Sequence, residues 1–259
     1  MAVMSSERAD PERVAGSSSS ERALPLGAEL DWEPAKTPER RELRGSHVLL
    51  RPIDANSDAA SLFSVSHPPA GDPAIWTYLP DGPYESPEAL HRMLRWAETA
   101  EDAVYFAVVP LPGERPLGIA AYLRIAPQVG AIEIGHIWFG VSLQRTTAAT
   151  EAIYLLARHA FDDLGYRRLE WKCNALNAAS RRAAERFGFT FEGVFRQHMV
   201  VKGRNRDTAW YAITDGEWPA IRRGFEGWLA PGNISGEGRQ VRALGELIGE
   251  ARHGGGGHA

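Results

Sequence analysis

The chain has 259 residues, of which 44% are apolar and 24% charged, as in an ordinary globular protein and unlike collagen, a wholly disordered chain or a membrane-embedded protein. Its 29 Lys and Arg residues against 33 Asp and Glu give a net charge of −4, which argues against nucleic acid as the main partner. The single cysteine, Cys173, permits no intramolecular disulfide, and no Cys/His cluster has zinc spacing, so no metal is expected.

The first 40 residues are expected to form a disordered tail, because their serine run and scattered charges bury little apolar surface. No apolar stretch follows a basic start, and nowhere are there the roughly 18 consecutive apolar residues of a membrane helix. The sequence therefore predicts a cytoplasmic protein that makes no membrane contact. One folded domain is expected over residues 41–230, followed over 231–259 by a C-terminal extension with a flexible, glycine-rich tail.

The first half of this domain alternates between strand-like and helical patterns. Serine as N-cap and proline at the first helical position mark one helix start clearly, at Ser86 and Pro87. A long, nearly continuous apolar run, Ala131–Ser142, predicts a central strand covered on both faces. The expected elements are a strand at His47–Arg51, helices at Ala55–Val65 and Pro87–Ala100, and strands at Val104–Val109, Leu117–Ile125 and Ala131–Ser142.

In the second half, a helix is predicted over Thr146–Leu164, where Gly165 supplies a left-handed cap, and another after the cap residue Asn177. The remaining elements are strands at Leu169–Cys173, Phe189–Val201 and Thr208–Thr214 and helices at Asn177–Phe187 and Glu217–Leu229. Strands alternate with helices only in this half, which indicates a mixed α/β domain.

The most informative segment is the junction of the central strand with the following helix, residues 132–152. Such a junction brings free backbone N–H groups and the positive end of a helix dipole to one point, which favours a phosphate or pyrophosphate. The sequence contains neither G-x-x-x-x-G-K-[ST] nor G-x-G-x-x-G after a strand, so neither an NTPase nor a dinucleotide-binding fold is supported.

This junction resembles the coenzyme A pyrophosphate loop of the GNAT superfamily of N-acetyltransferases, whose pattern is Gln/Arg-x-x-Gly-x-Gly/Ala. Gln144, Thr147 and Ala149 occupy its three defined positions, with threonine in place of the middle glycine. A second element, Asn-x-x-Ser followed after seven further residues by Gly-Phe, is similar to the family's other cofactor motif and spans 177–189. Residues 193–196 and 203–211 look like the closing strand pair of RimJ/RimL-type protein N-terminal acetyltransferases.

The resemblance implies a GNAT-like fold, a mixed and mostly antiparallel sheet of about seven strands with flanking helices. Its fourth and fifth strands, Ala131–Ser142 and Leu169–Cys173, are expected to splay apart and hold the pantetheine arm of acetyl-CoA, the cosubstrate. A backbone N–H of the fourth strand would polarise the thioester carbonyl while an amine attacks it directly. The residues that the resemblance assigns to cofactor binding are Phe139, Val141, Gln144, Arg145, Thr146, Thr147, Ala148, Ala149, Thr150, Asn177 and Ser180.

The resemblance also implies catalytic roles. Ser180 matches the serine that donates to the departing thiol, while Ala184 and Met199 stand where other members carry an acidic tyrosine and a glutamate base. Glu133 and His136 are therefore the candidates for the base, unless no protein group takes the proton. The two-residue period of a strand predicts that they lie on opposite faces, so that only one faces the substrate.

Several alternatives stay open at this stage. Asn177 and Ser180 equally fit the simple capping of a helix. The amine acceptor could be a protein or peptide N-terminus, or a small amine such as an antibiotic, and the chain could instead be a catalytically silent acyl-CoA-binding module. Either a monomer or a homodimer is compatible with the sequence. The region 53–88, which the resemblance places beside the acceptor, contains aromatic residues that fit either acceptor: Trp76, Tyr78 and Tyr84.

Overall fold

A computed structural model describes residues 24–236 and 239–254. The serine run and the glycines at 255–257 lie outside the described residues, and residues 24–33 contain no helix or strand. The compact part of the chain begins at Pro34, within the segment expected to be a tail. There, the N–H groups of Ala35 and Lys36 donate to the carbonyl oxygens of Pro127 (3.1 Å) and Leu164 (2.8 Å).

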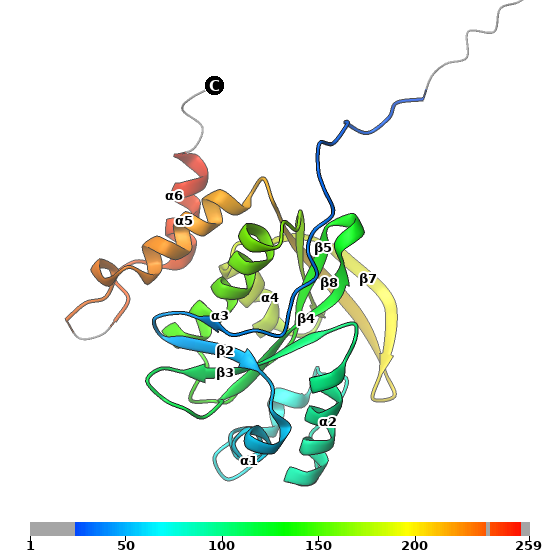
Figure 1. The fold of residues 1–259 in the computed structure, drawn as a ribbon, viewed down its shortest axis with the longest axis vertical. Coiled ribbons are helices and arrows are strands. Elements are labelled where there is room, and N and C mark those ends of the chain that lie inside the picture. The colour runs from blue at the N-terminus through cyan, green and yellow to red at the C-terminus, as the bar shows by residue number, and fades with distance from the viewer. Residues whose placement is uncertain (1–23, 237–238, 255–259) are drawn as a thin grey trace, which may run out of the picture. The chain divides into compact units, whose positions relative to one another are not determined.

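One eight-stranded sheet, in the order β1-β2-β3-β4-β5-β6-β8-β7, forms the centre of this part (Figure 1). All neighbours are antiparallel except β5 and β6, which confirms the mixed, mostly antiparallel sheet. The additional strand, β1, has two residues and is too short to show a periodic pattern. The strands are β1 (Leu43–Arg44), β2 (Val48–Pro52), β3 (Val104–Pro110), β4 (Gly118–Ala126), β5 (Ala131–Phe139), β6 (Arg168–Asn174), β7 (Thr190–Val201) and β8 (Arg204–Thr214).

Helices flank the sheet, and every predicted helix is present. They are α1 (Ala55–Ser66), α2 (Pro87–Thr99), α3 (Thr147–Arg158), α4 (Ala178–Arg186), α5 (Trp218–Leu229) and α6 (Leu244–His253). The sequence did not predict α6, which lies beside α5 (Figure 1). The two helices approach so closely at Gly224 that a Cβ there would lie 2.4 Å from Cγ1 of Ile248. Within the described residues, no helix is long and apolar enough to cross a membrane.

The parallel strands β5 and β6 diverge after a short paired stretch. Their register runs only from Ala131 opposite Arg168 to Glu133 opposite Glu170. Beyond Glu133 the two strands form an open wedge, which confirms the predicted splay. β5 ends at Phe139, before the predicted end at Ser142, because the chain turns at 140–145.

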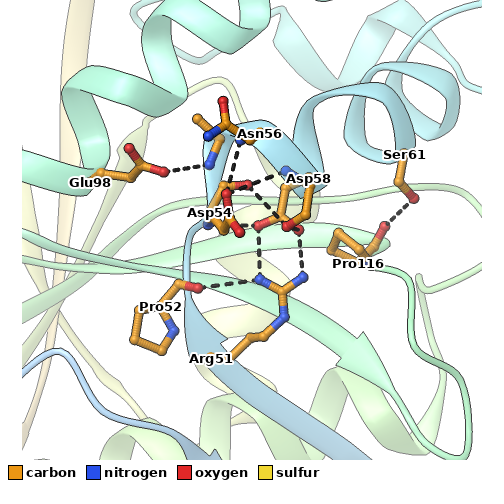
Figure 2. A network of polar contacts seen from close by, with 10 residues as sticks. Arg51, Pro52, Asp54, Asn56, Asp58, Ser61, Glu98 and Pro116 are labelled. Atoms are coloured by element: carbon orange, nitrogen blue, oxygen red, sulfur yellow. Dashed lines mark hydrogen bonds and ion pairs between the residues drawn. The ribbon is translucent and has the colours of Figure 1, made fainter.

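A polar network fixes the start of α1 against β2 and α2 (Figure 2). The Arg51 guanidinium donates twice to the fully buried carboxylate of Asp58, with Nη1 2.9 Å from Oδ2. Asp54 caps α1 by accepting hydrogen bonds from two N–H groups of its first turn, and the Glu98 carboxylate of α2 accepts from the N–H of Ala55. These contacts hold both helices and therefore also position the loop at 67–86 that connects them.

Candidate active site

Two cavities meet at the wedge between β5 and β6. A large groove of about 970 Å³ runs along the end of β5, the starts of α3 and α4, and residues 240–246. A small cavity of about 440 Å³ lies between the loop at 75–80, β5, β6 and the β7–β8 hairpin. Five residues line both: Ile75, Ile137, Trp171, Asn177 and Ser180. A molecule lying in the groove can therefore present one end to the small cavity.

The start of α3 offers free hydrogen-bond donors to the large groove. Thr146 is the N-cap, and its Oγ1 accepts from the N–H of Ala149 at 3.1 Å. Within the described chain, the N–H groups of Thr147 and Ala148 have no acceptor, as expected for the first two residues of a helix. Since the helix dipole adds positive potential there, this terminus suits an anion.

Most of the residues predicted to bind the cofactor lie along the large groove. Its lining includes Phe139, Gln144, Arg145, Ala149, Thr150, Asn177 and Ser180. Four others are not part of the lining: Val141, Thr146, Thr147 and Ala148. Val141 is exposed in the turn after β5, whereas the other three form the cap and the first turn of α3.

Arginines give the large groove a positive charge. Arg145, Arg182 and Arg186 line it, and none of them pairs with a carboxylate among the described residues. Arg186 donates to Oγ1 of Thr150 at 3.2 Å and lies 5.2 Å from the ring centroid of Trp228. Three cations without counter-ions make the groove suitable for a molecule with several negative charges.

The C-terminal extension supplies one wall of this groove, a role that the sequence did not predict. Residues 240–246 are held by the buried Asn233, whose Oδ1 accepts from the N–H of Arg242 at 2.8 Å. The apolar side chains of Leu244 and Ile248, four residues apart on α6, are both buried. That helical spacing was the available signal for α6.

Ser180 lies where the groove and the small cavity join. Its Oγ accepts a hydrogen bond from Nε1 of Trp171 at 3.0 Å, so its own proton is the one it can donate, with the Cys173 sulfur as a neighbour. Asn177 caps α4 by accepting from the N–H of Ser180 at 3.0 Å, so the hydroxyl is not needed for the cap. Burial raises the pKa of the neighbouring Cys173 thiol and so keeps that thiol protonated, while the Ser180 hydroxyl, directed toward its sulfur, acts in the opposite direction.

Glu133 lies in the small cavity, and two cations contact one oxygen of its carboxylate. Its Oε2 is 2.9 Å from Nζ of Lys172 and 3.0 Å from Nε of Arg124. Lys172 in turn lies 2.6 Å from Oε2 of Glu170. This network compensates the charge of Glu133 and ties β4, β5 and β6 together below the wedge.

His136 lines the same small cavity as Glu133, so the prediction that they lie on opposite faces is wrong. The register passes from Gly135 opposite Ala121 to Trp138 opposite Ile119, with two residues of β5 facing one of β4. His136 adopts a φ of 47° in this β-bulge, and the extra residue shifts the alternation of side chains. Burial lowers the pKa of His136, opposed by the charge of Asp81.

The aromatic residues at 76–84 have three different surroundings. Tyr78 lines the small cavity, and its hydroxyl donates to the carbonyl of Leu176 at 3.3 Å. Trp76, by contrast, is fully buried. The Tyr84 hydroxyl donates to Asp81, and burial together with that carboxylate raises the pKa of Tyr84. Only Tyr78 therefore faces the cavity as expected of an acceptor wall. Among the described residues, no three His, Cys, Asp or Glu side chains lie close enough together to hold a metal ion.

Comparison with known proteins identifies the fold and its relatives. Residues 47–190 match the model of the acetyltransferase (GNAT) domain. A GCN5-related N-acetyltransferase of Brucella melitensis is 44% identical, with a TM-score of 0.81 over 85% of this chain and 99% of that one. An acetyltransferase of Salmonella typhimurium that modifies the N-terminal serine of ribosomal protein L7/L12 shares the fold, at 22% identity and a TM-score of 0.58 over 67% of this chain and 99% of that one.

Among curated proteins, YdaF of Bacillus subtilis, named as a candidate ribosomal N-acetyltransferase, is 31% identical over 86 residues. That match covers 33% of this chain and spans slightly less than half, 46%, of YdaF. The family match and the Brucella melitensis structure confirm the resemblance to the GNAT superfamily.

Proposed function

Because the chain belongs to the acetyltransferase (GNAT) domain family, we propose that it transfers the acetyl group of acetyl-CoA to the α-amine of a protein or peptide. The observation that carries this proposal is the meeting of a positively charged groove and a separate small cavity at Ser180. The ribosomal substrate in the name of YdaF supports a protein acceptor and a cytoplasmic location. The small cavity would then receive the first residues of the acceptor.

The large groove fits acetyl-CoA in size and charge. The N–H groups of Thr147 and Ala148 are available to the pyrophosphate of acetyl-CoA. The guanidinium groups of Arg145, Arg182 and Arg186, which pair with no carboxylate among the described residues, are available to any of its phosphates. The wedge between β5 and β6 provides space for the pantetheine arm. When bound, acetyl-CoA supplies an acetyl group activated as a thioester.

The residues at the junction match the requirements of acetyl transfer. A carbon–nitrogen bond forms and the carbon–sulfur bond breaks, while the amine loses a proton and the departing thiolate gains one. The Ser180 hydroxyl accepts from Trp171 and can donate its proton as a hydrogen bond to that thiolate. Beyond Glu133, β5 is not paired with β6, so its N–H groups on that side are available to the thioester oxygen. Glu133 itself acts as a structural link, because its Oε2 joins Arg124 of β4 to Lys172 of β6.

The test combines binding with turnover. Calorimetry measures acetyl-CoA affinity, and release of free coenzyme A is followed with a panel of peptides, the same peptides with blocked N-termini, and small amines. The proposal predicts binding and turnover with free peptide N-termini, and none with blocked ones. Binding without turnover would identify a silent acyl-CoA-binding module. Turnover confined to small amines would assign the second kind of acceptor.

A further inference from the structure

A half-buried carboxylate, Asp81, directs its buried oxygen Oδ1 toward His136, whose imidazole lines the small cavity. We propose that the two form a pair in which the His136 imidazole takes the proton of the acceptor amine and Asp81 orients that imidazole and stabilises its charged form. This inference rests on the proposed function, since it assumes that an amine enters the small cavity. It adds Asp81 as a positioning residue from a loop that no sequence motif marked.

The surroundings of His136 assign different tasks to its two ring nitrogens. Nε2 is buried, makes no hydrogen bond, and lies 3.8 Å from Oδ1 of Asp81. Nδ1 makes no hydrogen bond within the described chain and is not among its buried unpaired atoms, so it is the nitrogen open to the cavity. With the proton on Nε2 toward the carboxylate, Nδ1 keeps a lone pair that can accept a proton. The ring packs edge-on against Tyr105, with centroids 5.4 Å apart.

One oxygen of the Asp81 carboxylate also lacks a hydrogen-bond donor. Its Oδ1 is buried without a partner, while the other oxygen accepts from the Tyr84 hydroxyl. A buried carboxylate oxygen that lacks a donor is costly, and Nε2 of His136 is the group that it faces. The separation of 3.8 Å is longer than a hydrogen bond, but contacts between catalytic groups commonly shorten when substrate binds.

The loop that carries Asp81 packs against Trp76 and is hydrogen-bonded to the β7–β8 turn. Gly82 has a φ of +62°, and a Cβ at this position would lie 2.5 Å from the ring of Trp76. Nζ of Lys202, in the β7–β8 turn, donates to the carbonyl of Trp76 at 2.7 Å. Asp81 is therefore positioned by close packing on one side and by a hydrogen bond from the opposite hairpin.

Among the charged groups around the cavity, Asp81 is the one that affects the pKa of His136. Burial and Asp81 are the two influences on the pKa of His136, and they act in opposite directions. Because burial dominates, the imidazole is neutral near pH 7 and able to accept a proton. The remaining charged or titratable groups that line the cavity or lie beside it are Tyr78, Asp102, Tyr105, Arg124, Glu133, Lys172, Cys173, His198, Lys202 and Arg206.

The test measures the pKa of His136 directly. In protein with labelled histidines, NMR titration is carried out on the parent, Asp81→Asn and Asp102→Asn. Removing the Asp81 carboxylate should lower the pKa of His136, because that charge stabilises the imidazolium. Asp102→Asn removes a carboxylate from the same cavity that does not act on His136, and should leave this pKa unchanged.

Kinetics then test the role in the reaction. The acidic limb of the kcat/KM profile should move to lower pH in Asp81→Asn, with a plateau about 10- to 100-fold lower, and His136→Gln should lose about 10²- to 10⁴-fold. Asp81→Glu should recover part of the loss. Acetyl-CoA affinity, measured in parallel, should change little, since neither residue lines the large groove.

Two outcomes would overturn the pair. One is an unchanged His136 pKa in Asp81→Asn. The other is a shifted pKa with an unchanged plateau and an unmoved acidic limb, which would make the contact structural. Failure of the parent protein to acetylate any amine would instead overturn the proposed function, and the catalytic role of the pair with it. The NMR titration would still report whether the two residues interact.

Discussion

Replacing Ser180 with alanine separates a chemical role from a structural one. The hydroxyl accepts from Nε1 of Trp171, a buried side chain, at 3.0 Å, and Asn177 caps α4 without it. Loss of the hydrogen bond to the departing thiolate should lower kcat by about 10²-fold, or about 2.7 kcal/mol. The unpaired Trp171 N–H should lower the free energy of unfolding by about 1–3 kcal/mol.

Three measurements distinguish these effects. Steady-state kinetics at saturating acetyl-CoA give kcat, calorimetry gives cofactor affinity, and urea unfolding gives stability. We expect kcat to fall far more than affinity, and Ser180→Thr, which keeps a hydroxyl, to retain more activity than Ser180→Ala. An unchanged kcat together with reduced stability would refute the chemical role and leave Ser180 as a partner of Trp171 alone.

Three further substitutions test the groove and the scaffold. Thr147→Glu should abolish acetyl-CoA binding in calorimetry, although a carboxylate in the first turn favours the helix; parent-like affinity would contradict the assigned phosphate position. Asp58→Ala leaves Arg51 without its buried partner and should cost about 3–5 kcal/mol in urea unfolding, whereas a negligible loss would mean that water replaces the carboxylate. Gly224→Val should displace α6 at Ile248 and weaken acetyl-CoA binding through the wall at 240–246, and unchanged affinity would separate that wall from the cofactor.

Local sequence signals predicted most of the fold. Ser86 caps α2, Asn177 caps α4, and Gly165 has a φ of +79°, as the capping patterns indicated. These features depend on a few neighbouring residues and are therefore visible in the sequence. The first strand was missed because two residues show no periodicity, and α6 because its short apolar face follows a polar, glycine-containing segment.

The site was predictable only where it depends on local pattern. The start of α3 and the position of Ser180 follow from motifs that are continuous in the sequence. The orientation of His136 depends on the register between β4 and β5, and the bulge that sets this register has no local signature. Asp81 lies in a Pro-Asp-Gly-Pro turn whose sequence predicts only a turn; its place beside His136 is a property of the assembled fold.

The central claim is that the acetyl group passes directly to an amine at the junction beside Ser180. A single-turnover reaction of acetyl-CoA with an excess of enzyme and a reactive peptide, quenched rapidly and analysed by mass spectrometry, tests it most directly. We predict one acetyl group on the peptide N-terminus, formed at the rate at which coenzyme A appears, and none on the enzyme at any time. An acetylated enzyme that forms and then decays as the peptide gains its acetyl group, on Cys173 or elsewhere, would contradict this account.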